Sequence, residues 1–165
     1  MPRLYHVHKK TVPGLNTVAD FFANIFEPLF SATVSPEDHP EVHLFLQQVV
    51  GFDSVDDESL GERKIWKDPP LCHTWDSAEN PPYSYYISYM WANLNVLNKL
   101  RQARGFNTFS LRPHSGEAGE LDHMVMCVYA TDTRARTYTH ALNDTHAHTH
   151  AHTRTHTYTH AHTHR

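Results

Sequence analysis

The chain has 165 residues and a formal net charge of −4 at neutral pH, from 18 Asp and Glu against 14 Lys and Arg. The first 130 residues are also acidic, with 16 acidic and 10 basic side chains, so net charge gives no reason to expect binding to nucleic acid or to an anionic membrane. No apolar run approaches membrane-spanning length. The length fits one domain of ordinary size.

Two features of the sequence indicate the compartment. The start, "MPRLYHVHKK", lacks the continuous apolar segment of a secretory signal. The two cysteines, Cys72 and Cys127, are more typical of a reduced intracellular protein than of a disulfide framework. We therefore expect a cytosolic (cytoplasmic) protein.

The first predicted element is a helix over residues 16–34. Its apolar side chains recur at helical spacing, so that one face can be buried. A proline, Pro28, is expected to bend or end it. The apolar residues are Val18, Phe21, Phe22, Ile25, Phe26 and Leu29.

A short helix and a buried strand follow. The segment "HPEVHLFLQQ" predicts the helix, and residues 49–55 are β-branched and aromatic with few polar interruptions. Such a run is typical of a parallel strand covered on both faces. It places Asp56, Asp57 and Glu58 at its carboxyl end.

The second half of the body continues the alternation of helices and strands. Residues 60–82 are rich in Pro, Trp and charge and predict a long loop. A helix opens at Pro82 and ends at Gly105, a strand covers residues 107–111, and a helix covers residues 119–129. This order predicts an α/β domain with a parallel sheet, because parallel neighbours need helical crossovers.

Residues 131–165 form a Thr/His-rich segment of alternating composition, and nine of the sixteen histidines lie between His140 and His164. The pattern fits a metal-binding tract or an alternating strand. It also fits translation of a CA dinucleotide repeat, which gives Thr-His and, by single transitions, Ala, Arg and Tyr. We favour the repeat, and expect a disordered tail that binds Zn, Ni or Cu weakly.

The chemical motif is "RPHSGEAGE", in which His114 precedes Glu117 by three residues. A neutral imidazole at a strand end can bind zinc, and a carboxylate turned by Gly116 and Gly119 can reach a substrate held by the same metal. On spacing alone, the pair is more often two hydrogen-bonded loop residues.

Longer motifs strongly resemble AMP deaminase, a metal-dependent (β/α)8 barrel of the adenosine deaminase type. They are "VVGFDSVDDES", "NPPYSYYISYMWANLNVLNKLRQARG" and "FSLRPHSGEAG", in this order, with "PRLY" and the helix "ANIFEPLFSATVSPEDHPEVHLFLQQ" before them. The resemblance covers about residues 2–130. It implies that residues 1–130 are an incomplete fragment of a TIM-type barrel, around its fourth and fifth strands, and that 131–165 are a separate tail.

The resemblance also implies the reaction, which converts AMP to IMP and ammonia in purine nucleotide metabolism. His114 would be a zinc ligand and Glu117 the group that protonates the purine ring as a zinc-activated water attacks. Asp53, Asp56 and Asp57 would line the purine pocket, or instead cap the loop that follows them. Members of the family are expected to be homo-oligomers.

Other parts of the family's ligand set have no counterpart here. His6 and His8 spell the family's "H-x-H" pattern but lie in a segment that matches a later part of the family. His123 is expected to be a surface or packing residue. With one zinc ligand, the chain is expected to bind zinc poorly and to be inactive alone. The alternative is a non-catalytic interaction protein whose His-rich tail binds metal weakly.

Overall fold

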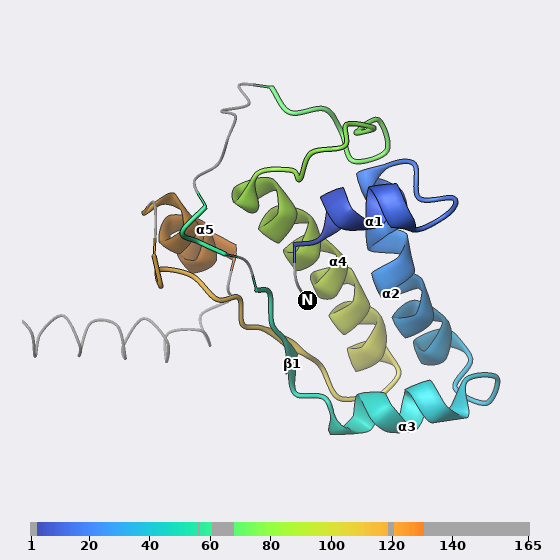
Figure 1. The fold of residues 1–165 in the computed structure, drawn as a ribbon. Coiled ribbons are helices and arrows are strands. Elements are labelled where there is room, and N and C mark those ends of the chain that lie inside the picture. Colours follow the sequence, from blue (N-terminus) through green and yellow to red (C-terminus); the bar gives the residue numbers. More distant parts are fainter. Residues whose placement is uncertain (1–2, 56, 61–67, 119–120, 131–165) are drawn as a thin grey trace, which may run out of the picture. The chain divides into compact units, whose positions relative to one another are not determined.

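The computed structural model describes residues 3–55, 57–60, 68–118 and 121–130, all within one compact unit. The predictions made for Asp56 and for residues 131–165 lie outside the described residues. In chain order the elements are α1 (Tyr5–Thr11), α2 (Val18–Val34), α3 (Pro40–Gln48), β1 (Gly51–Phe52), α4 (Tyr83–Ala103), β2 (Ser110–Leu111) and α5 (Asp122–Ala130) (Figure 1).

Helix α2 starts at a capping box, in which Thr17 and Asp20 each bond the other's backbone N–H. The helix continues past Pro28 to Val34, so of the two expectations for this proline, a bend or an end, the end is wrong. The proline removes one backbone donor, whereas burial on both sides of it holds the helix together, since Phe26 and Ala32 are fully enclosed. Helix α1 was not predicted.

The core lies where α2 packs on α4. The ring of Phe22 stacks on Tyr86 at 5.6 Å and on Tyr89 at 5.7 Å between centroids. Among the aromatic residues of α4, Tyr83 and Tyr86 are buried in this core at 1% exposure, whereas Trp91 is 42% exposed.

The two strands form a parallel pair, with Gly51 opposite Ser110 and Phe52 opposite Leu111. The predicted α/β class with parallel pairing is therefore confirmed. Glycine is required at position 51, because a Cβ there would lie 2.7 Å from the carbonyl oxygen of Ser110. Both strands are shorter than predicted, and burial on both faces is wrong, since Val50 is 67% exposed.

Arg101, on α4, connects the segments that precede the two strands. Its guanidinium is fully buried and donates to the carbonyl and side-chain oxygens of Asn107 and to the Thr33 hydroxyl. Asn107 in turn donates to the carbonyls of Leu46 and Val49, at 3.0 Å each. These bonds connect α2, α4 and the segments just before both strands, so Arg101 fixes where the strands begin.

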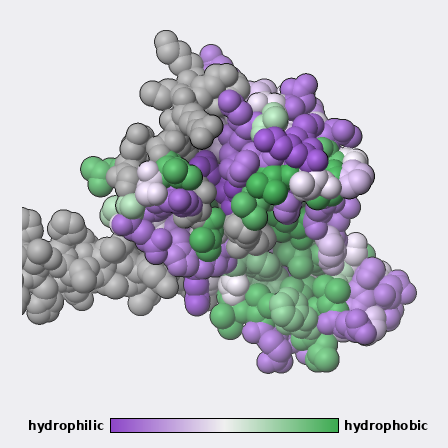
Figure 2. Space-filling view, in the orientation of Figure 1, coloured by the Kyte–Doolittle hydropathy of each residue, from purple (hydrophilic) through white to green (hydrophobic). Residues whose placement is uncertain are grey.

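Figure 2 shows the largest group of hydrophobic side chains in the lower middle of this face, where α3 and the adjoining ends of α2 and α4 lie, while the upper part and the right edge are mostly hydrophilic. Large apolar side chains of these elements are exposed, among them Val34, Leu44, Phe45 and Val96. Within the described ranges, no helix combines the length and apolarity needed to cross a bilayer.

Replacing Arg101 with Met should lower the free energy of unfolding by about 2–4 kcal/mol, because Asn107 and Thr33 lose buried partners. Chemical denaturation measures this value. The exposed Arg104, replaced in the same way, serves as the control and should change stability by no more than about 0.5 kcal/mol. Equal effects of the two substitutions would contradict the assigned role of Arg101.

Candidate functional site

The parallel pairing continues beyond the two strands and brings their carboxyl ends together. Arg112 N–H donates to the Phe52 carbonyl at 2.8 Å, and His114 N–H donates to the Ser54 carbonyl at 2.9 Å. Phe52, Ser54 and Glu58 therefore lie beside residues 112–118. The described polar residues that follow the two strands thus meet at one edge of the sheet.

His114 and Asp53 form the first contact of the site. The imidazole Nδ1 lies 2.7 Å from Asp53 Oδ1, and both side chains are 44% exposed. A carboxylate only accepts, so Nδ1 carries the proton and Nε2 is the nitrogen with a lone pair to offer. The Asp53 hydrogen bond raises the pKa of His114, and the charges of Asp53, Glu117 and Glu58 add to this effect.

Glu117 lies on an exposed turn after His114. Its charge acts on the imidazole, so the two side chains predicted to share one site are within electrostatic range of each other. Asp57 instead accepts from the backbone N–H and the hydroxyl of Ser59. This contact is the loop-capping role that the sequence left open for Asp57.

The sequence placed Glu58 after the first strand but indicated no role for it in the site. Its carboxylate is 2% exposed and accepts the backbone N–H groups of Gly116, Glu117 and Ala118. It also lies 3.5 Å from Nδ1 of His123. The sequence does contain a signal for this contact. Three carboxylates follow the first strand and a glycine-containing turn follows the second, and the backbone N–H groups of such a turn can surround an anion.

Tyr83, the first residue of α4, contacts the site through its hydroxyl and its ring. Its hydroxyl donates to the carbonyl of His114 at 2.9 Å and lies 2.9 Å from the Cys127 sulfur. Its ring stacks on His123, with centroids 4.2 Å apart, which confirms packing as a role of this histidine. Burial, followed by the bond with Cys127, raises the pKa of the Tyr83 phenol, so it stays protonated.

The described residues include no group of three or more His, Cys, Asp or Glu side chains placed to hold a metal ion. His114, through Nε2, is suited to supply one ligand. His8 packs on Phe21, and the backbone N–H of His6 bonds the side chain of Asn80. Both lie on α1, and neither interaction belongs to the site around His114.

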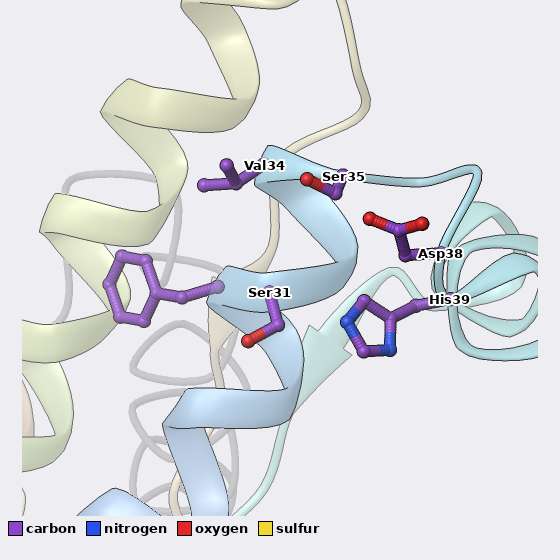
Figure 3. A pocket seen from close by; sticks show the side chains of 6 residues that line it. Ser31, Val34, Ser35, Asp38 and His39 are labelled. Carbon is purple, nitrogen blue, oxygen red and sulfur yellow. The ribbon is translucent and has the colours of Figure 1, made fainter.

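A separate open pocket lies at the end of α2 and the turn that follows it (Figure 3). Its polar side chains are those of Ser31, Ser35, Asp38 and His39, beside Phe30 and Val34. None of these is a predicted site residue.

Replacing Asp53 with Asn should lower the pKa of His114, because the imidazolium loses its charged acceptor. NMR titration of the His114 ring protons measures this change. The raised pKa means that the pair stabilises the folded chain at pH below the pKa of an unfolded histidine, and that this stabilisation is lost as pH rises through the folded value.

The exposed carboxyl of Asp38, replaced by Asn, is the matched control and should leave the His114 titration unchanged. An unchanged pKa in the Asp53 variant would show that the contact does not control this imidazole.

Comparisons of the sequence with known proteins point to one family. The sequence model of the AMP deaminase family matches residues 1–145. The chain is 52% identical over 129 residues to the AMP deaminase of Dictyostelium discoideum, covering 78% of this chain and 16% of that protein. It is 54% identical over 125 residues to the AMP deaminase of Schizosaccharomyces pombe, and the match covers 75% of this chain and 15% of that protein.

The AMP deaminase of Arabidopsis thaliana is 49% identical over 145 residues, which are 87% of this chain and 16% of that relative. The chain thus spans about 16% of the length of the curated relatives it matches. A family model that matches nearly the whole chain, together with identities near 50%, settles the relationship. The chain belongs to the AMP deaminase family.

Proposed function

We propose that this chain carries one part of the catalytic centre of an AMP deaminase, which hydrolyses AMP to IMP and ammonia in purine nucleotide metabolism and IMP biosynthesis. Family membership supports the reaction. The observation that carries the assignment to particular residues is the meeting of His114, Asp53 and Glu117 at one sheet edge.

We assign His114 as a zinc ligand through Nε2. The hydrogen bond from Nδ1 to Asp53 fixes the orientation and the tautomer of the ring. Histidines that bind a metal through one ring nitrogen often donate from the other to a carboxylate in this way. When bound, zinc supplies a water of lowered pKa that can act as a nucleophile near neutral pH. The remaining ligands must come from residues outside those the structure describes.

Glu117 is the group we assign to proton transfer. Its side chain is exposed, so it can reach a nucleotide bound beside His114. It gives a proton to a ring nitrogen of the purine, which makes the carbon that bears the amino group easier to attack, and it takes a proton from the attacking water. The carbon–oxygen bond forms, the proton of the new hydroxyl passes to the amino group, the carbon–nitrogen bond breaks, and ammonia leaves, with a carbonyl oxygen remaining on the ring carbon.

Asp53, Asp56 and Asp57 are our candidates for contacts with the purine or with residues that touch it. Asp53 acts through His114 in this proposal. Asp57 is engaged with Ser59 and would have to exchange that bond for one to the substrate. Asp56 lies outside the described residues.

For the architecture, we propose that β1, α4 and β2 form one unit of a (β/α)8 barrel, near its fourth and fifth strands. Parallel pairing across a helical connection supports this. We keep residues 1–130 as the barrel segment and 131–165 as the tail, and we propose a cytosolic homo-oligomer.

The chain by itself should not deaminate AMP, because His114 is the one proposed ligand among the described residues and a catalytic zinc needs three protein ligands. A second candidate function is non-catalytic docking onto a partner protein. The exposed apolar side chains Leu44, Phe45 and Val50 favour it. In that reading, the His-rich tail would bind metal weakly.

A hybrid enzyme tests the catalytic assignment. In it, the segment of the S. pombe AMP deaminase that matches this chain is replaced by the residues of this chain. The hybrid should bind zinc and deaminate AMP, which the loss of adenine absorbance measures. Replacing His114 with Ala should remove both zinc and activity. Replacing Glu117 with Gln should leave zinc in place and lower kcat by about 10²–10⁴-fold.

The exposed His73, replaced by Ala, is the control and should change neither property. A Glu117 variant with full activity, or an inactive hybrid that contains its zinc, would count against the assignment. Deamination by the 165-residue chain alone would refute its proposed inactivity.

A further inference from the structure

We infer that Glu58 is the positioning residue for Glu117: its buried carboxylate holds the turn from which Glu117 projects. The inference rests on the proposed function for the role of Glu117, but the contacts of Glu58 stand independently of it. Glu58 was not among the residues that the sequence singled out as functional.

The contacts are three hydrogen bonds from one turn to one carboxylate. Oε1 accepts from Gly116 N–H at 3.0 Å, and Oε2 accepts from Glu117 N–H at 2.6 Å and from Ala118 N–H at 3.1 Å. Bonds from backbone N–H groups to a charged carboxylate are about twice as strong as neutral ones. Three of them to a side chain 2% exposed leave the turn little freedom.

The glycine of this turn makes the arrangement possible. Gly116 has φ of +80°, a conformation that other residues rarely adopt, and it turns successive N–H groups toward one point. Met124 of α5 lies directly against this glycine. A Cβ at position 116 would lie 2.7 Å from Cγ and Sδ of Met124.

Residues of α4 and α5 cover the outer side of Glu58. His123 lies 3.5 Å from its Oε1 and is itself 7% exposed, and the ring of His123 stacks on Tyr83. Because it is enclosed in this way, the carboxylate of Glu58 cannot reach a nucleotide that binds at the exposed side chains of His114 and Glu117. Glu58 therefore acts through the turn and takes no part in the chemistry itself.

The shortest of the three bonds is made by the backbone of Glu117. It fixes the Cα of this residue while the carboxyl group stays exposed. A group that transfers protons must lie within hydrogen-bonding reach of its target, and a misplacement of about 1 Å can cost on the order of 10²-fold in rate. Holding the turn therefore sets the turnover rate and leaves the binding of substrate largely unaffected.

Hydrogen exchange of the 165-residue chain, followed by NMR, tests the contacts. In E58Q the side-chain amide presents N–H groups to backbone donors, so the amides of Gly116, Glu117 and Ala118 should exchange at least about tenfold faster. The amides of residues 90–100 in α4 should be unchanged. E37Q, which alters an exposed carboxyl, is the matched control and should change neither set.

If E58Q unfolds the whole chain, E58D is the second variant. It keeps the charge and shortens the side chain by one methylene group, so the same three amides should exchange faster while α4 stays protected. Unchanged exchange at these amides in a folded variant would overturn the inference.

Kinetics of the hybrid enzyme separate positioning from a merely structural role. E58Q should lower kcat at least tenfold, change the KM for AMP by less than threefold and leave the zinc content unchanged. Faster exchange with an unchanged kcat would overturn the positioning role. If E117Q is fully active, the proposed function fails, while the exchange result still decides whether Glu58 holds the turn.

Discussion

The parallel hydrogen-bond ladder between β1 and β2 is the interaction on which the candidate site depends. It runs past the strands and ends with the bond from His114 N–H to the Ser54 carbonyl. This register places Asp53 against the imidazole and Glu58 under the turn at residues 116–118. A shift of one strand along the other by a residue or more would separate Asp53 from His114 and Glu58 from its turn. The missing side chain of Gly51 allows the close approach, and the bonds of Arg101 and Asn107 set where the ladder begins.

Three carboxylates at this edge have three environments, and the environments explain the different roles we assign. Asp53 is half exposed and holds an imidazole. Glu58 is buried, and its two oxygens accept from three backbone N–H groups. Glu117 is exposed and stands on the turn that Glu58 holds. A group that exchanges protons must meet the substrate, whereas groups that orient others work best when packing and hydrogen bonds fix them.

Much of this could be predicted from local patterns, and the rest depends on contacts distant in sequence. Helical spacing placed α2 and α4, and the β-branched run after α3 located β1. Pro28 does not end α2, because packing holds the helix together across a missing donor. Both strands were predicted too long, because a strand extends only as far as it has a neighbouring strand to pair with. Glu58 escaped because its contacts cross about sixty residues and depend on the geometry of a glycine turn. The family motifs named His114 and Glu117, whose roles stay proposals.

The central claim is that Asp53 holds Nδ1 of His114 so that Nε2 faces a metal beside Glu117. A crystal structure of the hybrid enzyme with zinc tests it most directly. We expect Nε2 to lie about 2.0–2.1 Å from the metal and Asp53 to remain on Nδ1. Zinc bound to Nδ1 with Asp53 displaced, or zinc held elsewhere with His114 unliganded, would contradict it.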